Sequence, residues 1–230
     1  MFAMQKSLLF LPEAIPELIR NSPLMKKGGF DVFVGLLDDH AHTQMLAEAM
    51  SLSTTARMSE VLTPDNEDGR GGNPPRRYLT APGGPIQDAF YHSDWVRDLL
   101  QQVTGTPLVP TGVRGTYSYY ARPGDYLALH RDIVTCDVAV ITCLNEGPNV
   151  TGSSGMLCLY PDRIYEPLSA IRDTLEEKAV GVRLMPKQTI VLFGGIVPHM
   201  LLPVAYQQVR IISVLCYRVP LSGGATYLCF

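Results

Sequence analysis

Two histidines and one aspartate are the residues of this chain best suited to holding a metal ion. His130 closes the mainly apolar run 126–130, and Asp132 follows two positions later. Because side chains alternate between the faces of a strand, positions 130 and 132 project to the same side. His199 follows the apolar run 189–193 and the pair Gly194-Gly195. Two imidazoles and one carboxylate on one face of an octahedral ion leave three positions open, an arrangement typical of non-haem iron(II) oxygenases.

A single arginine interrupts an otherwise apolar run further along the chain. Arg210 comes eleven residues after His199, within the predicted strand 207–215. A buried charge without a partner is costly, so Arg210 is expected to meet an anion. The planar guanidinium suits bidentate capture of a carboxylate. A dicarboxylic acid that also chelates the metal would supply that carboxylate, which describes 2-oxoglutarate.

Residues 107–217 resemble the catalytic core of the iron(II)- and 2-oxoglutarate-dependent dioxygenases, and within them the prolyl-hydroxylase-like branch. The resemblance implies a double-stranded β-helix, also called a jelly roll, and the cofactors Fe(II), 2-oxoglutarate and O2. It further implies that His130, Asp132 and His199 ligate iron, that Arg210 binds the distal carboxylate of 2-oxoglutarate, and that Tyr120 donates a hydrogen bond to it near the metal. The matching residues occur in family order: Tyr120, Gly124, His130-x-Asp132, Leu144-Asn145, Phe193, His199, Pro203-Val204 and Arg210.

The chain departs from the pattern of this branch at two positions. Cys143 stands before Leu144-Asn145, where the branch often has a tyrosine that contacts the cosubstrate. We expect that hydrogen bond to be missing or to come from Thr142 or Tyr119. Ile212 stands two residues after Arg210, where a serine or threonine is usual.

Three arginines are candidates for contacting the substrate. Arg76 and Arg77 lie in the segment 63–85, whose many Gly, Pro and charged residues predict a loop, and such a loop could close over an anionic substrate as a lid. Arg131 lies between two inward positions and is therefore expected to point away from the metal, with a surface role favoured over a substrate contact. His92-Ser93-Asp94 repeats the His-x-Asp spacing, but its position at a predicted helix start favours a structural role.

The elements that must position these residues change in character near residue 107. The first part predicts a short strand within 30–37, a helix from about Asp38, and a helix from Ser93 to Gly105 that includes Trp95 on its buried face. From 107 onward, short β-rich runs separated by Gly, Pro, Asn and Asp predict an antiparallel barrel, interrupted by one helix near 167–178. The expected fold is α+β and mainly β, a single domain over 1–230. Residues 1–106 would form the helical support and lid loop, and residues 107–218 the jelly-roll core.

Composition excludes several classes of protein. The 230 residues include 19 Lys+Arg and 22 Asp+Glu, so the net charge of −3 argues against a nucleic-acid-binding surface. No run approaches the length of a membrane span, and the first residues do not form a secretory signal. The five cysteines, an odd number without metal-binding spacing, predict reduced thiols in a cytoplasmic protein.

The sequence therefore predicts an oxygenase that hydroxylates a small molecule, such as an amino acid or a natural-product intermediate. Oxidation of a peptide or protein, as in prolyl hydroxylases, is the second hypothesis. A nucleobase demethylase is a third, disfavoured by the acidic charge. A jelly-roll ligand-binding or sensor domain is the non-enzymatic alternative.

Overall fold

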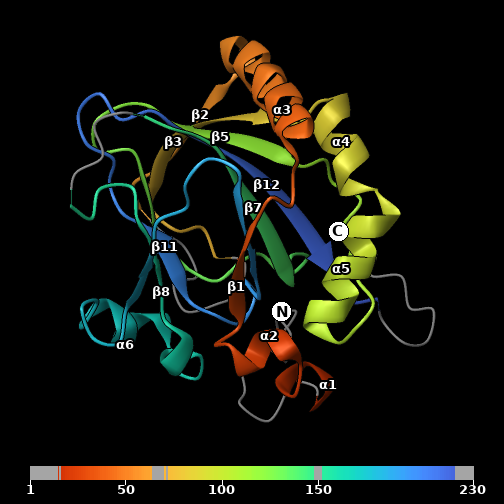
Figure 1. Ribbon diagram of the computed structural model, residues 1–230. Coiled ribbons are helices and arrows are strands. Elements are labelled where there is room, and N and C mark those ends of the chain that lie inside the picture. The colour runs from red at the N-terminus through yellow and green to blue at the C-terminus, as the bar shows by residue number, and fades with distance from the viewer. Residues whose placement is uncertain (1–14, 16, 64–69, 71, 148–151, 221–230) are drawn as a thin grey trace, which may run out of the picture.

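The computed structural model describes residues 15, 17–63, 70, 72–147 and 152–220 (Figure 1). Its strands form one antiparallel, strongly curled sheet in the order β1-β10-β7-β12-β5-β3-β6-β11-β8-β9, with β2 paired to β3 and β4 to β12. Neighbours in the sheet come from distant parts of the chain, as a double-stranded β-helix requires. The strands are β1 (Phe30–Val34), β2 (Arg57–Val61), β3 (Arg76–Pro82), β4 (Val109–Pro110), β5 (Thr116–Tyr120), β6 (Tyr126–His130), β7 (Val138–Glu146), β8 (Leu157–Leu159), β9 (Val180–Val182), β10 (Gln188–Leu192), β11 (His199–Leu201) and β12 (Arg210–Arg218).

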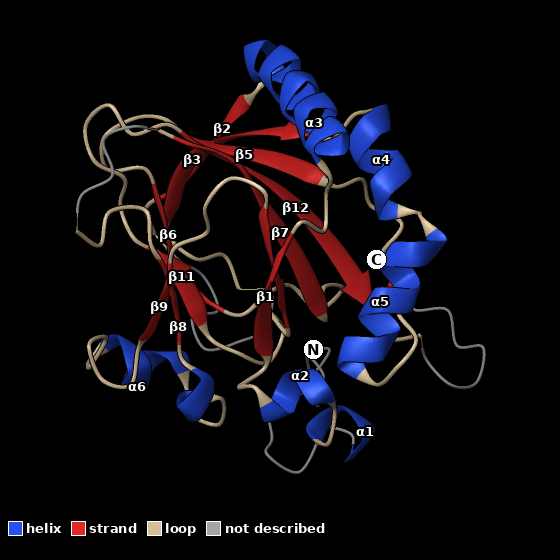
Figure 2. Cartoon of the chain, in the orientation of Figure 1, coloured by secondary structure: helices blue, strands red, loops and turns tan. Residues whose placement is uncertain are grey.

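The helices lie on the outside of the sheet (Figure 2). α3, α4 and α5 run along the layer that contains β5, β12 and β7, while α6 lies beside β8 and β9. Their bounds, with two short 3-10 helices, are α1 (Glu17–Arg20), α2 (Pro23–Lys26), α3 (Asp39–Leu52), η3 (Ser53–Thr55), α4 (Pro85–Tyr91), α5 (Asp94–Thr104), η4 (Pro161–Arg163) and α6 (Leu168–Arg172).

Two of the three hydrophobic clusters among the described residues lie on opposite faces of the layer that contains β5, β7 and β12. The outer core joins α3, α4 and α5 to outward residues of β5, β7 and β12, such as Tyr119 and Leu215. The inner core lies between the two layers of the barrel and includes Tyr120, Cys143 and Ile212 from one layer and Leu159 and Leu201 from the other. The face of the sheet on which a side chain lies therefore determines whether it packs against a helix or inside the barrel.

Tyrosines on β5 fasten α3 to the outer face. The Tyr119 hydroxyl donates to the Ala49 carbonyl oxygen at 2.7 Å, and the Tyr117 hydroxyl donates to Glu48 at 2.6 Å. Glu48 also accepts from the backbone N–H groups of Ile86 and Gln87, in the first turn of α4. One carboxylate thus links α3, α4 and β5.

A β-bulge changes the alternation of side chains along β7. Ile211 pairs with Asn145, but its neighbour Ile212 pairs with Cys143, so Leu144 is an extra residue on β7. Because the bulge shifts the alternation by one, Cys143 and Glu146 share the interior face although they are three residues apart.

The structure corrects the predicted loop at 63–85. Residues 76–82 form β3, which lies between β5 and β6 in the sheet, and α4 begins at Pro85. The prolines that suggested a loop stand before β3 and at its end. The region 1–106 therefore supplies strands to the barrel as well as helices. Of the predicted lid, residues 64–69 and 71 lie outside the described part of the chain.

Two further expectations were wrong. Trp95 is 48% exposed and makes an edge contact with Phe90, because it precedes the buried positions Val96 and Leu100 of α5. Cys136 and Cys216 are joined in a disulfide rather than reduced, whereas Cys143 and Cys158 are free. Cys229 lies outside the described residues.

Across the part of the chain that is described, every helix falls short of the length and apolar character that crossing a bilayer requires.

Candidate functional site

The two predicted histidine ligands face each other across a strand pair. His130 ends β6, His199 begins β11, and the two residues are register partners in the antiparallel ladder. Their ring centroids are 4.2 Å apart. Strand pairing therefore brings together two imidazoles that are far apart in the sequence.

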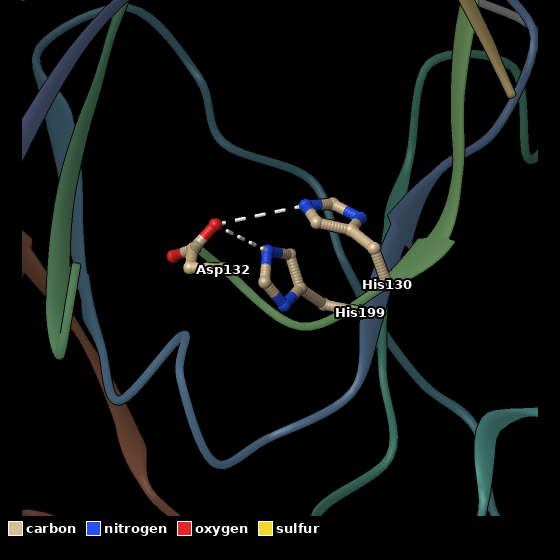
Figure 3. A group of neighbouring side chains, drawn as sticks. All are labelled: His130, Asp132 and His199. Carbon is tan, nitrogen blue, oxygen red and sulfur yellow. Dashed lines mark ion pairs between the residues drawn. The ribbon is translucent and has the colours of Figure 1, made fainter. Parts of the chain in front are cut away.

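Asp132 completes the group (Figure 3). Its Oδ1 lies 3.6 Å from His130 Nε2 and 3.7 Å from His199 Nε2. One ligand atom from each of the three residues falls within 4.8 Å of the others. The three side chains converge on one point, as the spacing of the sequence predicts.

Backbone contacts fix both imidazoles with Nε2 directed at the site. His130 Nδ1 lies 2.8 Å from the Ala128 carbonyl oxygen, and His199 Nδ1 lies 2.9 Å from that of Val197. A carbonyl oxygen can only accept, so Nδ1 carries the proton in each ring and Nε2 keeps its lone pair. Histidine ligands of metal ions are commonly oriented in this way, by a hydrogen bond from the ring nitrogen that does not bind the metal.

A glycine allows the aspartate to approach. The Asp132 N–H donates to the Gly194 carbonyl oxygen at 2.8 Å, and a Cβ at position 194 would lie 1.8 Å from Asp132 Oδ2. Gly195 makes room in the same way for the Arg70 guanidinium, 2.4 Å from where its Cβ would be. Arg70 is buried and donates to the carbonyl oxygens of Asp132 and Cys136 and to Asp137. The glycine pair and Arg70 together hold the segment that carries the carboxylate.

The charge states of the triad suit metal binding. Burial, and after it the electrostatic effect of the neighbouring His130, lowers the pKa of His199 to about 4, so the His199 imidazole is neutral near pH 7. Burial alone would raise the pKa of Asp132, but the neighbouring His130, His199 and Arg70 side chains hold it below its usual value. A neutral His199 imidazole and an ionised Asp132 carboxylate, with the His130 imidazole beside them, fit a divalent transition metal such as Fe(II). The side chains of His130 and Asp132 remain 12% and 18% exposed, which leaves room for further ligands.

Arg210 lies on the same interior face of the barrel. It is register partner of Tyr120 on β5 and of Glu146 on β7. Its guanidinium is buried, forms an ion pair with Glu146 and donates to the Leu184 carbonyl oxygen. Tyr120 is also buried, and its ring lies 5.0 Å from that of Tyr78. Both predicted cosubstrate contacts therefore point into the barrel, and the anion beside Arg210 in this structure is a glutamate.

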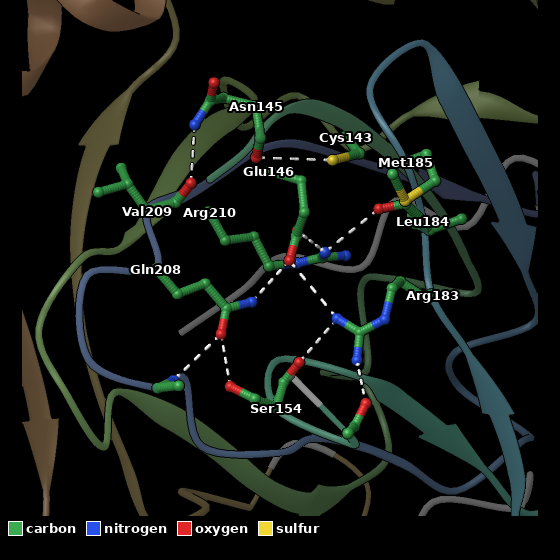
Figure 4. A network of polar contacts seen from close by, with 12 residues as sticks. Cys143, Asn145, Glu146, Ser154, Arg183, Leu184, Met185, Gln208, Val209 and Arg210 are labelled. Atoms are coloured by element: carbon green, nitrogen blue, oxygen red, sulfur yellow. Dashed lines mark hydrogen bonds and ion pairs between the residues drawn. The ribbon is translucent and has the colours of Figure 1, made fainter. Parts of the chain in front are cut away.

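Glu146 is the centre of a polar network at this end of the barrel (Figure 4). Gln208 Nε2 donates to its Oε1 at 2.6 Å, and Arg183 Nη1 lies 3.6 Å from the same oxygen. Arg183 also donates to the carbonyl oxygens of Ser154 and Gly152. The network therefore connects three separate loops to Arg210.

The alternative cosubstrate contacts are not on this face. Thr142 Oγ1 lies 2.8 Å from Thr189 Oγ1. The side chains next to Thr142 on its face of β7 belong to the outer core. Tyr119 donates to α3. The expected contact from Thr142 or Tyr119 was wrong because both residues face outward: Thr142 alternates with the inward Cys143 on β7, and Tyr119 alternates with the inward Tyr120 on β5. The Cys143 thiol itself is buried, which raises its pKa to about 12.

The three arginines proposed for the substrate have different surroundings. Arg76 shares a face of β3 with Tyr78 and donates to Ser59 Oγ and Asn73 Oδ1. Arg77 points to the other face, where it pairs with Asp125. Arg131 is 3% exposed and donates to backbone carbonyl oxygens of Ile196, Ile164 and Glu166, so the surface position expected for it was wrong. Its contacts support a role in holding loops, and a role of Arg76 toward the substrate stays a prediction.

Tyr78 is a site residue that the sequence did not reveal. The composition of its segment predicts a loop, yet Tyr78 is partly buried and packs against the inner core beside Tyr120. Burial raises the pKa of its hydroxyl, and the negative charge of Asp132 acts in the same direction. Tyr78 therefore lies on β3 between β5, which carries Tyr120, and β6, which carries His130. The alternation of Tyr78 and Thr80 between prolines was the available signal of a strand.

The overall arrangement can be compared with solved structures. A prolyl hydroxylase from Trichoplax adhaerens, in complex with a hypoxia inducible factor peptide, superposes with a TM-score of 0.58 at 20% identity, covering 87% of each chain. SnoN, a non-haem α-ketoglutarate-dependent epimerase from nogalamycin biosynthesis, gives 0.62 at 14% identity over 92% of each chain. HygX from Streptomyces hygroscopicus, solved with nickel and 2-oxoglutarate, gives 0.63 at 12% identity over 86% of this chain and 85% of that one.

The chain has the fold of the 2-oxoglutarate-dependent oxygenases. No family model matches its sequence, and no curated protein does. The fold identified from the ordered residues of the sequence is thus confirmed by structure, at identities too low for the likeness to extend beyond the fold.

Proposed function

We propose that this chain is an Fe(II)- and 2-oxoglutarate-dependent oxygenase that oxidises an unactivated C–H bond of a small molecule, by hydroxylation. An amino acid or a natural-product intermediate is the expected class of substrate. The observation that carries the proposal is the convergence of His130 Nε2, His199 Nε2 and Asp132 Oδ1 inside a barrel that also contains a buried arginine.

The residues of the chain would divide the work as follows. His130, Asp132 and His199 hold the metal, with both imidazoles fixed by backbone carbonyl oxygens. Arg210 binds the distal carboxylate of 2-oxoglutarate, and Tyr120 offers its hydroxyl on the same face. When bound, Fe(II) with 2-oxoglutarate and O2 supplies the oxidising chemistry and releases succinate and CO2. The inner core excludes water from the closed end of the barrel.

A small-molecule substrate is supported by two similar folds. SnoN acts in nogalamycin biosynthesis, and HygX has been solved with hygromycin B bound. Oxidation of a peptide is the second candidate, supported by the prolyl hydroxylase that binds a peptide fragment. The net charge of −3 argues against nucleic acid as a substrate.

The proposal is tested first by spectroscopy. Purified protein mixed with Fe(II) and 2-oxoglutarate under nitrogen should develop the visible metal-to-ligand charge-transfer band. The Asp132→Ala variant, which lacks the carboxylate ligand, should stay colourless. A colourless wild-type protein would contradict the proposed function and favour a binding domain of the same fold.

The substrate class is tested by turnover. Amino acids, metabolites and peptides are screened for compounds that stimulate release of succinate from 2-oxoglutarate in air. We expect stimulation by a small molecule. Stimulation by peptides alone would favour the second candidate.

A further inference from the structure

The ion pair between Arg210 and Glu146 uses one nitrogen of the guanidinium, Nη1, and leaves Nε without a partner among the described residues. Nη1 contacts Glu146 Oε2 and lies 3.3 Å from the Leu184 carbonyl oxygen. Nε is fully buried and has no hydrogen-bond partner among the described residues. Nε and Nη2 together form the edge of a guanidinium that binds a carboxylate bidentately. An unpaired buried donor is costly, so this edge is suited to an anionic ligand.

Glu146 is held too firmly to act as a mobile occupant of that edge. Its side chain is 1% exposed, Gln208 donates to Oε1, and Arg183 lies on the same oxygen. Gln208 is itself fully buried and accepts from the backbone N–H of Ala205. The carboxylate is therefore fixed by contacts from β12 and from two of the loops at this end of the barrel.

The charges of this cluster also call for one further anion. Arg210 and Arg183 carry two positive charges against the single negative charge of Glu146. One positive charge remains in excess in a largely buried place, and one carboxylate would neutralise it.

We propose that Glu146 is a positioning residue for cosubstrate binding: it holds the Nη1 side of Arg210 and so presents the Nε–Nη2 edge to the distal carboxylate of 2-oxoglutarate. The inference rests on the proposed function. It assigns Glu146 no contact with the cosubstrate, because its effect acts through Arg210. The bulge at Leu144 is what places Glu146 on the interior face, opposite Arg210.

The test compares two ligands that differ in the distal carboxylate. Wild type, Glu146→Gln and Glu146→Asp are loaded with Mn(II), and binding of 2-oxoglutarate and of oxalate is measured by calorimetry. Oxalate can chelate the metal but has no group for Arg210. Both substitutions should weaken 2-oxoglutarate binding by about tenfold or more, because Arg210 loses the contact that orients it. Oxalate binding should be unchanged.

Glu48→Gln is the matched control. It makes the same substitution at a carboxylate that accepts three hydrogen bonds, but on the outer face of the sheet. It should lower the melting temperature and leave the binding of both ligands unchanged. Glu146→Asp keeps the buried charge, so it provides a folded variant if Glu146→Gln does not fold.

Three results would overturn the inference. Unchanged or tighter binding of 2-oxoglutarate in the Glu146 variants would mean that Glu146 is not needed or that it competes for Arg210. An equal loss for oxalate would mean that the substitutions act on the whole site. A wild-type protein that binds oxalate but not 2-oxoglutarate would remove the role of Arg210, and one that binds neither would contradict the proposed function itself.

Discussion

Glycine at position 194 is a condition for the proposed metal site, because the Asp132 carboxylate occupies the space that any Cβ there would need. The His-x-Asp pair, the distal histidine and the lone arginine could all be predicted from residue type and spacing. The residues that hold these side chains in place could not be predicted in this way. Arg70 and Glu146 act through contacts that join distant segments, and nothing in their local sequence marks them.

Gly194→Ala should lower the affinity for a metal ion more than it lowers the stability of the fold. The added methyl group would force the Asp132 carboxylate away from the two imidazoles. We expect a loss of Mn(II) affinity of about tenfold or more, which is typical when a group that holds a metal ligand in place is changed, and calorimetry measures it. Gly181→Ala is the control, since its methyl group meets the flexible Met156 side chain. Equal Mn(II) affinity in both variants would contradict the role of Gly194.

Arg210→Met should lower both stability and cosubstrate binding, because it removes the nearer charge partner of the buried Glu146 and leaves only Arg183, 3.6 Å away. Breaking a buried pair in this way typically costs about 3–5 kcal/mol of unfolding free energy. Adding Glu146→Gln removes a buried charge that has lost its nearer partner and should recover part of that stability, measured by chemical denaturation. Binding of 2-oxoglutarate should stay weak in the double variant, and its recovery would refute Arg210 as the anchor.

At the scale of elements, strand alternation and helix capping explain most of what the sequence predicted. α3 begins after Asp38, whose side chain accepts from the Ala41 N–H, and α5 ends at Gly105 in the left-handed region. Tyr117 and Tyr119 face the helices and Tyr120 faces the interior, as alternation requires. β3 was missed because its prolines and arginines resemble a loop, and only pairing with β5 and β6 makes it a strand. The bulge in β7 has no signal in the local sequence.

Tyr119→Phe should loosen α3 from β5. The Tyr119 hydroxyl donates to the Ala49 carbonyl oxygen from a buried position, so its loss should lower the unfolding free energy by about 1–2 kcal/mol near pH 7. Denaturation of the two proteins at pH 7.5 measures this difference. An unchanged free energy would show that the hydrogen bond does not stabilise the helix.

The same variant should report the titration of this hydroxyl. Burial and the charge of Glu48 raise the pKa of Tyr119 from 10.0 to about 12. The folded protein then keeps a proton that the unfolded chain loses above pH 10, so this residue's contribution to stability falls as the pH rises from 10 toward 12. The difference between wild type and Tyr119→Phe should therefore shrink between pH 9 and pH 11, whereas a constant difference would contradict the raised pKa.

At the scale of the whole molecule, the short β-rich runs that begin near residue 107 predicted a jelly roll, but they did not predict that earlier residues also contribute strands to it. β1, β2 and β3, all from the first hundred residues, complete the sheet. The disulfide was also missed, because pairing of Cys136 with Cys216 depends on the fold bringing together residues that are 80 positions apart. It ties the segment after Asp132 to β12, the strand that carries Arg210.

Reduction of this disulfide should lower the stability of the whole fold. A cross-link that closes a long loop restricts the unfolded chain, and removing one typically costs about 2–4 kcal/mol. Cys216→Ser should therefore unfold at lower denaturant concentration than wild type, and a reductant should have little further effect on it. Cys158→Ser, at a free thiol, is the control. If a reductant does not change the stability of wild type, the two thiols are not joined in the purified protein.

The extra residue in β7 also determines how this chain is to be aligned with distant relatives. Since Leu144 has no partner of its own on β12, a one-residue gap relative to a homologue with a regular strand belongs at that position. An alignment that places the gap elsewhere matches barrel-lining side chains of one protein to helix-facing side chains of the other beyond that point. Glu146 would then be compared with surface residues, and a search for homologues that share it would fail.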